Sequence, residues 1–351
     1  MNNFLKDIVK KTKNKYAAVA ADGIPGADVQ GFVDTGSYLF NAMVSGSIYG
    51  GLATNKITAI AGPEATGKTF FALSVVQNFL KTNPKGVVLY YDTEQAITTQ
   101  MLEERNIPKD RIAILPVVTV EDFRFQLLQV LNDYQDKGEE TPMLCVCDSL
   151  GMLSTNKEIE DTADGKTTKD MTRAGLIKAT FRVLTLKLGQ LGIPLLLTNH
   201  TYEGMGMFAT TTMSGGQGLK YSASTIIHLS KKKDRDGTEV IGVIIHCKTI
   251  KSRLTKENQM IDVQLNYTTG LNRYYGLVAI AVEAGIFKKM STKIELPDGT
   301  TRFEKAINKD PKKYFTQDVL DQIEKFVKTK FCYGTSIENA EKELEDELTN
   351  E

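Results

Sequence analysis

A short run of small and polar residues, Gly62 to Thr69, fits the phosphate-binding pattern G-x-x-x-x-G-K-[ST] at every fixed position. Its glycines let the backbone approach a polyphosphate, which then meets converging amide N–H groups and the positive end of the following helix. Lys68 supplies a point charge for the β- and γ-phosphates, and the Thr69 hydroxyl suits Mg²⁺. We therefore expect a nucleoside triphosphate to be held by Gly62, Pro63, Glu64, Ala65, Thr66, Gly67, Lys68, Thr69 and Phe70.

Three further polar residues follow apolar stretches that are predicted to be strands. Asp148 comes after Met143 to Cys147, and a carboxylate there helps to hold Mg²⁺ beside a phosphate loop. Glu94 ends the strand that begins at Gly86, where it can polarise an attacking water. Its rival is Asp92, two residues earlier, and we favour Glu94 because its longer side chain reaches further past the strand end.

His200 ends a third predicted strand, Ile193 to Thr198, directly before a glycine-rich stretch. A strand-end histidine is often only a hydrogen-bonded residue. The stretch beside it favours a different role, because ordering of a segment is a common response to a γ-phosphate. We expect His200 to sense that phosphate.

Strands and helices alternate from the phosphate loop to about residue 200, which predicts an α/β fold with a mainly parallel, doubly wound sheet. Helices are expected at 2–20, 98–106, 121–136, 173–190, 274–285 and 317–328. Strands that alternate at 224–229, 239–246 and 260–265, with a turn at Asp236-Gly237, predict an antiparallel edge.

Two polar stretches, 154–170 and 201–222, show no periodicity. Structureless segments of this length inside a compact domain are usually functional or disordered. Each begins just past the carboxyl end of a predicted strand, where open α/β sheets bind their ligands. A functional role is therefore favoured for both.

Composition sets further limits. Lys+Arg and Asp+Glu balance at 43 each, so net charge does not point to a nucleic-acid partner. No apolar run approaches the ~20 residues of a membrane span, and the lysine-rich start lacks the apolar core of a secretory signal. Cys145, Cys147, Cys247 and Cys332 show no metal-ligand spacing, so free buried thiols in a reducing, cytoplasmic compartment are expected.

Together these motifs resemble the RecA-family recombinases, in particular the UvsX-type recombinases of tailed phages. The resemblance covers about residues 32 to 285. It rests on the phosphate loop, Tyr91-Asp92-Thr93-Glu94, Asp148-Ser149-Leu150-Gly151, Asp170-Met171-Thr172-Arg173-Ala174, Thr198 to Glu203, and Lys251-Ser252-Arg253.

The resemblance implies a RecA-like P-loop ATPase core with ATP and Mg²⁺ as cofactors. It makes Glu94 and Lys68 catalytic, Asp148 and Thr69 metal ligands, and His200 the γ-phosphate sensor. Lys251 and Arg253 match basic residues that reach the neighbouring subunit's ATP, although alone they would suggest a solvated turn. Met101 stands where related proteins place an aromatic residue on the adenine.

The two polar stretches match the family's DNA-binding loops, at about 154–171 and 201–223. The residues expected to contact DNA are Lys157, Lys166, Lys169, Arg173, Met205, Met207, Phe208, Gly215 and Gly216. Basic side chains would hold the backbone, and apolar side chains of the second loop would insert between bases.

The expected organisation is an oligomerisation helix and linker at 1–33, an ATPase core at 34–270, a small C-terminal domain at 271–335 and an acidic tail at 336–351. The basic start and the acidic tail are either interaction arms or solvated helix faces.

The expected activity is DNA-dependent ATP hydrolysis in a helical filament on single-stranded DNA, with pairing to homologous double-stranded DNA. The resemblance also implies a phage single-strand-binding protein and a recombination mediator as partners. A ring helicase with the same core and a mediator that uses ATP only to assemble are the alternatives. A phosphotransferase is less favoured, because nothing in the sequence suggests an acceptor pocket.

Overall fold

The computed structural model describes residues 3–14, 16–166, 172–203, 211–214, 217–236, 239–267 and 269–334. The chain forms two compact units. The first comprises Met1–Val33 and Ala53–Ile226, and the second Asp34–Leu52 and Ile227–Glu351. The short strands β1 (Phe32–Val33) and β2 (Leu52–Ala53) lie where the chain passes between them.

Parallel strands form the centre of the first unit, in the order β3-β7-β6-β4-β5. Every residue of β3 is buried, as expected for a strand covered on both faces. This confirms the predicted α/β fold with a mainly parallel sheet. The strands are β3 (Ile57–Gly62), β4 (Val87–Asp92), β5 (Ile112–Pro116), β6 (Met143–Asp148) and β7 (Leu195–Glu203).

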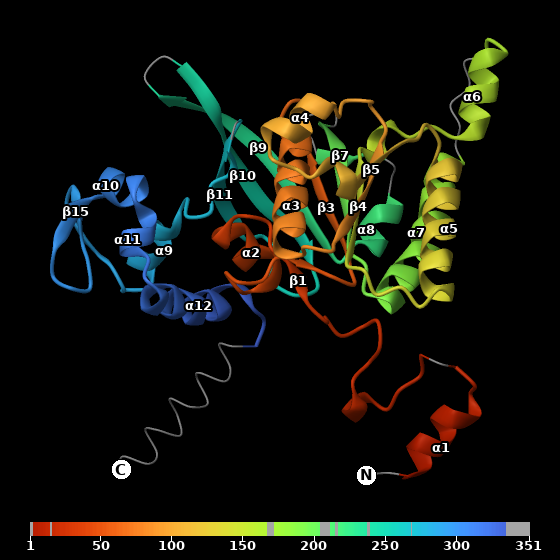
Figure 1. The fold of residues 1–351 in the computed structure, drawn as a ribbon, viewed down its shortest axis with the longest axis horizontal. Helices are drawn as coiled ribbons and strands as arrows, with labels where there is room; N and C mark the ends of the chain where they lie inside the picture. Colours follow the sequence, from red (N-terminus) through yellow and green to blue (C-terminus); the bar gives the residue numbers. More distant parts are fainter. Residues whose placement is uncertain are drawn as a thin grey trace. The chain divides into compact units, whose positions relative to one another are not determined.

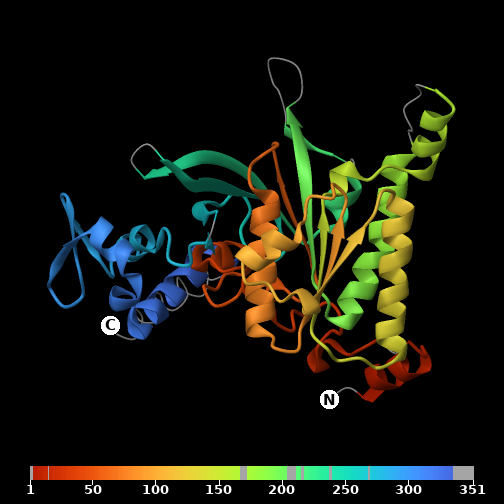
Figure 2. The same ribbon diagram turned by 45° about the horizontal axis from the view of Figure 1, so that its top comes forward.

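Helices connect these strands and cover both faces of the sheet. Because crossovers between parallel strands are right-handed, the strand order puts α3 and α4 on one face and α5 and α7 on the other. The helix α8 packs against α7. Figures 1 and 2 show the strands between α3 and the pair formed by α5 and α7. The helices are α3 (Lys68–Thr82), α4 (Thr99–Glu104), α5 (Val120–Asp136), α7 (Arg173–Leu191) and α8 (Gln217–Ser222).

The N-terminal helix is shorter than the sequence predicts. The helix α1 (Asn3–Lys11) ends where Thr12 donates its hydroxyl to Val9 O and Lys13 adopts a positive φ of 53°. The expected helix over 2–20 is therefore wrong beyond residue 11. Tyr16 then accepts a hydrogen bond from Gln135 on α5 at 2.6 Å, so the linker contacts the core of its own chain.

Both polar stretches contain regular structure that the absence of periodicity did not predict. The first holds α6 (Asn156–Ala163), which begins with a capping box between Thr155 and Glu158. The second continues β7 to Glu203, and β8 (Thr211–Met213) pairs with it antiparallel. The parts of the two loops next to the core, which we call the loop stems, are therefore a helix and two paired strands. Residues 167–171 and 204–210 lie outside the described part.

The long strands that make up much of the second unit lie in the order β9-β10-β11-β12. Gly242 to Lys248 of β10 pair with Asn266 to Met260 of β11, which confirms the predicted antiparallel strands. The strands are β9 (Thr225–Asp236), β10 (Glu239–Ser252), β11 (Met260–Asn266) and β12 (Gly270–Leu271).

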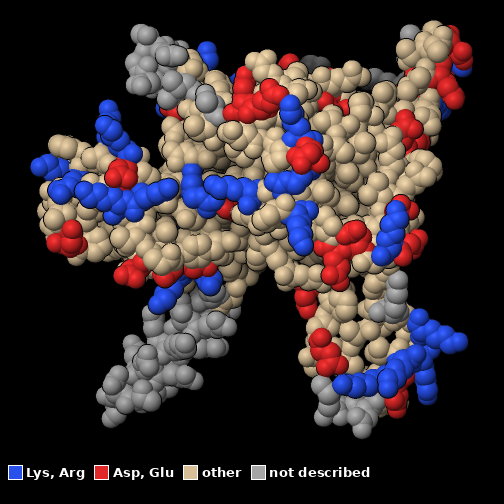
Figure 3. Space-filling model, viewed as in Figure 1, with Lys and Arg blue, Asp and Glu red and all other residues tan. Residues whose placement is uncertain are grey.

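Helices and a small sheet complete the second unit. The buried α2 is capped by Ser37, whose hydroxyl accepts from Phe40 N, and it packs on β11 and α12. Lysines gather over α10 and α11 (Figure 3). The elements are α2 (Tyr38–Ser45), α9 (Leu277–Glu283), β13 (Lys288–Met290), β14 (Lys293–Glu295), β15 (Thr301–Phe303), α10 (Glu304–Lys309), α11 (Pro311–Tyr314) and α12 (Gln317–Phe331).

All four cysteines are free thiols, as expected, but Cys332 is only half-buried. Cys145, Cys147 and Cys247 are buried, and burial raises the pKa of Cys145 to about 12. Across the described residues, no helix is long and apolar enough to cross a bilayer.

Candidate nucleotide site

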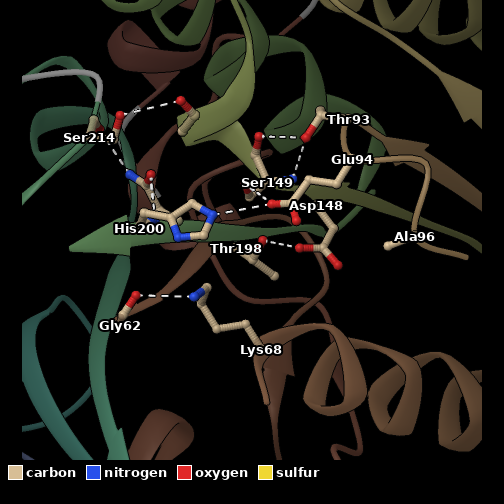
Figure 4. Close-up of polar contacts among 12 residues, drawn as sticks. Gly62, Lys68, Thr93, Glu94, Ala96, Asp148, Ser149, Thr198, His200 and Ser214 are labelled. Carbon is tan, nitrogen blue, oxygen red and sulfur yellow. Dashed lines mark hydrogen bonds and ion pairs between the residues drawn. The ribbon is translucent and has the colours of Figure 1, made fainter. Parts of the chain in front are cut away.

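The carboxyl ends of four parallel strands meet at one edge of the first unit's sheet. Gly62 of β3 lies in register with His200 of β7, and Asp92 of β4 lies in register with Asp148 of β6. Because the strand order is β3-β7-β6-β4, the polar groups that the sequence singled out lie side by side (Figure 4). This edge is where open α/β sheets bind ligands.

The phosphate loop joins β3 to α3 in a conformation that suits an anion. Ala65 and Gly67 have positive φ values of 55° and 88°, and Gly67 is the N-cap of α3 without a side chain to occupy its first amides. Lys68 is buried and donates to the carbonyls of Gly62 at 3.1 Å and Pro63 at 2.9 Å. The ammonium group therefore lies within the loop that the sequence assigned to phosphates.

Asp148 is held by two hydroxyl groups from neighbouring strands. Tyr90 donates to its Oδ2 at 2.7 Å, and Thr198 donates to its Oδ1. Burial and the nearby Asp148 carboxylate raise the pKa of Tyr90 well above its ordinary value, so this phenol keeps its proton and remains a donor. The two bonds fix the carboxylate, which is 6% exposed.

Asp92 and Glu94 have different surroundings. Asp92 is buried, and it accepts hydrogen bonds from the backbone amides of Glu94, Ala96 and Ile97 at 3.0–3.2 Å. Its carboxylate thus closes the turn after β4. The Glu94 side chain is 39% exposed and extends toward His200. This geometry favours Glu94 as the residue that polarises an attacking water, and Asp92 as the residue that stabilises the turn.

Glu94 is oriented through one of its two carboxylate oxygens. Ser149 donates its hydroxyl to Glu94 Oε1 at 3.0 Å, and His200 Nε2 lies 3.2 Å from the same oxygen. Ser149 is held in turn, because its amide donates to Thr93 Oγ1 and its carbonyl accepts from that hydroxyl. These contacts leave Oε2 as the oxygen that can accept a proton from water.

Phe70 and Met101 both contact Arg105, a buried residue that the sequence did not indicate. The Arg105 guanidinium lies 4.5 Å from the centre of the Phe70 ring and donates to Met101 O at 3.0 Å. Burial lowers the pKa of Arg105 from its ordinary value. Met101 lies on α4, whose N-cap is Thr98, and its expected contact with adenine stays a prediction.

The candidate DNA contacts are only partly within the described residues. Lys157 is exposed on α6, and Lys166 pairs with Asp164 at 2.8 Å and Asp161 at 3.4 Å. Arg173 is half-buried and donates to Leu153 O and Gly151 O. The other expected contacts, Lys169, Met205, Met207, Phe208, Gly215 and Gly216, lie outside the described residues.

Lys251 and Arg253 lie in the second unit, at the end of β10 and just after it. The buried Ser252 between them organises the following turn, since its hydroxyl accepts from Leu254 N at 3.2 Å and Thr255 N at 2.9 Å. Arg253 is exposed and Lys251 half-buried. Their expected role at a neighbour's nucleotide stays a prediction.

The residues present fit a Mg²⁺-bound triphosphate. Within the described part of the chain, no group of three or more histidine, cysteine or acidic side chains gathers to hold a metal. Mg²⁺ does not need such a group in P-loop proteins, where one hydroxyl and one carboxylate act together with phosphate oxygens and water. Thr69 and the fixed Asp148 match that pair.

The sequence also missed three residues that hold the Asp148 and Glu94 carboxylates: Tyr90, Thr198 and Ser149. Tyr90 and Thr198 lie inside apolar strands, where the period of two does not distinguish a residue that bonds a carboxylate from one that fills the core. Ser149 follows Asp148 directly, and its position after a strand end was the available signal.

The sequence is similar to known proteins along most of its length. Residues 3–272 match the family described as the RecA N-terminal domain. A recombination and repair protein of Enterobacteria phage T4 is 34% identical over 251 residues, which cover 72% of this chain and 63% of that protein. The chain thus spans less than two thirds of that relative's length.

Bacterial relatives align over more of the chain. Protein RecA of Streptomyces rimosus is 26% identical over 298 residues, covering 83% of this chain and 75% of that one. Protein RecA of Bifidobacterium breve is 26% identical over 344 residues, covering 95% and 83%. Because the family match spans most of the chain, including the P-loop and all four strand ends, the chain belongs to the RecA family of nucleotide-binding proteins.

Proposed function

We propose that this chain is an ATP-dependent DNA recombinase that forms helical filaments on single-stranded DNA and catalyses homologous pairing and strand exchange. The observation that carries the proposal is the 3.2 Å approach of His200 to Glu94 beside the P-loop and Asp148. His200 belongs to the strand that continues into the second polar loop, so one residue joins the hydrolytic group to that loop.

In the proposed hydrolysis, Glu94 accepts a proton from water through Oε2 while Ser149 and His200 hold Oε1. Lys68 supplies positive charge to the β- and γ-phosphates. Thr69 and Asp148 would hold Mg²⁺, which when bound neutralises charge on the phosphate oxygens. Asp92 keeps the turn that carries Glu94 in place.

Binding of the γ-phosphate would be reported by His200 to the hairpin of β7 and β8, and so to the second loop. Single-stranded DNA would then be held through backbone charge by Lys157, Lys166 and Lys169, with Met205, Met207 and Phe208 against the bases. Such contacts do not read sequence, so homology is tested by base pairing with the duplex.

Filament formation follows from contacts between copies. Lys251 and Arg253 of one subunit would reach the nucleotide of the next. Residues 1–33 would pack on an adjoining copy, because α1 exposes Phe4, Leu5 and Ile8 along one helix. The basic surface of α1 is opposite in charge to the tail at 336–351, and together they would tune access of DNA.

The name of the phage relative supports a role in DNA recombination and repair. Recombination-dependent replication in the host cytoplasm would fit that role. A phage single-strand-binding protein and a recombination mediator are the proposed protein partners.

Negative-stain imaging with single-stranded DNA and a slowly hydrolysed ATP analogue tests the proposal. Helical filaments are expected from the wild type and from the control Lys81→Ala, an exposed lysine at the end of α3. Lys68→Ala should form none. Closed hexamers that unwind a fork would replace the proposal with a ring helicase, and undiminished Lys68→Ala filaments would count against the site.

A further inference from the structure

The carbonyl oxygen of Gly151 receives one donor from the end of the first polar loop and one from within the second. Arg173, where the first loop ends and α7 begins, donates Nη2 to this oxygen at 2.9 Å. Ser214, which follows β8 in the second loop, donates Oγ to it at 3.5 Å. Gly151 belongs to the short turn Leu150–Met152 just after Asp148. Both loops are thus joined next to the strand end that carries Asp148.

Arg173 directs its guanidinium into the protein. Its Nε donates to Leu153 O at 2.8 Å while Nη2 donates to Gly151 O, so two nitrogens of one rigid fork bind two carbonyls two residues apart. A lysine can reach one such carbonyl but cannot reproduce the fork. The geometry suits an arginine that fixes a turn more than one that meets a DNA phosphate.

Ser214 is tied to β7 on its other side. Its amide donates to His200 O at 3.0 Å, and its carbonyl accepts from Asn199 Nδ2 at 2.9 Å. Asn199 is fully buried. The second loop is therefore bonded at Ser214 to His200, whose ring lies against Glu94 (Figure 4).

Gly151 permits this close approach because it has no side chain. A Cβ built there would lie 2.9 Å from Asn199 Oδ1, 3.2 Å from His200 Cδ2 and 3.2 Å from Ser214 Cβ. At least the first distance is shorter than real Cβ contacts, so alanine would push the turn away from β7.

We propose that Gly151, Arg173, Asn199 and Ser214 form a clasp that transmits the position of His200 and Asp148 to both loops. Arg173 is then a positioning residue in place of the phosphate contact expected from the sequence. The inference rests on the proposed function, since it assumes that the loops hold single-stranded DNA.

The salt dependence of DNA binding separates the two roles of Arg173. A lost phosphate contact reduces the slope of log K against log [salt] by about 0.7 on single strands. For Arg173→Ala and Arg173→Lys the clasp predicts an unchanged slope, together with about tenfold weaker stimulation of ATP hydrolysis by DNA, the effect of losing one hydrogen bond to a charged group. The control Arg182→Ala, exposed on α7, should match the wild type.

The clasp would be overturned if Arg173→Ala reduced the slope of log K against log [salt] and Arg173→Lys kept the wild-type slope. Gly151→Ala tests the clasp without changing any charge, and it should weaken the stimulation of ATP hydrolysis by DNA as the Arg173 variants do. Gly151→Ala with wild-type stimulation would also overturn the inference.

If the wild type shows no stimulation by DNA, the proposed function fails and amide hydrogen exchange still tests the clasp. Exchange at Thr211 to Ser214 should be faster in Arg173→Lys than in Arg182→Ala. Equal exchange rates in the two variants would overturn the clasp.

Discussion

Replacing Asp92 by asparagine tests whether the Asp92 carboxylate stabilises the turn after β4 or takes part in ATP hydrolysis. Asp92 Oδ1 accepts from the amides of Glu94 and Ala96, and Oδ2 accepts from the amide of Ile97. Asparagine can keep the first two bonds, but its amide group would then face the N–H of Ile97. One charge-assisted bond is lost and a buried donor loses its acceptor, which together cost about 2–3 kcal/mol.

Urea unfolding without nucleotide measures this cost. For Asp92→Asn we expect a midpoint lower by about 1 M, since the free energy of unfolding falls by ~1–3 kcal/mol per molar urea. The matched variant Glu94→Gln should keep the wild-type midpoint, because its side chain is partly exposed and holds no backbone amide. Glu94→Gln should instead bind ATP and fail to hydrolyse it. A wild-type midpoint for Asp92→Asn combined with abolished hydrolysis would refute the assignment and transfer the chemical role to Asp92.

Three further predictions follow from the described contacts. Tyr90→Phe and Thr198→Val each remove one donor to Asp148, so hydrolysis should need about tenfold more Mg²⁺ for half-maximal rate, and an unchanged requirement would contradict their role. Burial raises the pKa of Cys145 to about 12. The stability contributed by the buried neutral thiol is therefore complete below the pKa of the thiol in the unfolded chain, and it is lost as the pH rises toward 12. Cys145→Ser should flatten the decline of the free energy of unfolding at alkaline pH. Burial alone would raise the pKa of Asp34, but hydrogen bonds from Asn41 and Arg273 outweigh burial and lower this pKa. The stability that the ionised carboxylate contributes above its ordinary pKa of 3.8 is therefore lost as the pH falls below that value. Asp34→Asn should reduce this loss of stability in acid.

The sequence predicted which polar groups lie together at the carboxyl ends of the parallel strands. The P-loop has a fixed spacing, and Asp148, Glu94 and His200 each follow an apolar strand, so the parallel sheet brings them to one edge. The RecA-family resemblance is confirmed, and with it the α/β core. The sequence favoured Glu94 over Asp92 only by the length of its side chain, because both can end the strand. The structure adds the three amides that bond Asp92 and the contacts of Glu94 with Ser149 and His200.

Regular structure in the loop stems was missed for a different reason. Hydrophobic periodicity cannot reveal a helix such as α6, none of whose residues is buried. The capping box of Thr155 and Glu158 was the available signal. The edge strand β5 was also missed, since it has five residues and none of them is fully buried. The clasp at Gly151 depends on contacts between segments about 20 and 60 residues apart, which no local pattern encodes.

In the proposed filament, one nucleotide is gripped by two adjoining copies, through the P-loop of one and the basic pair, Lys251 and Arg253, of the next. Mixing two inactive variants tests this claim most directly. Glu94→Gln binds ATP but lacks the hydrolytic carboxylate beside the P-loop, and the double variant Lys251→Ala/Arg253→Ala lacks the basic pair. In a head-to-tail filament built randomly from equal amounts, about one interface in four combines an intact Glu94 with an intact basic pair. Because about one interface in four is intact, we predict that DNA-dependent ATP hydrolysis in the mixture recovers to about a quarter of the wild-type rate. A mixture no more active than its separate components would contradict the claim and place the complete site within one copy.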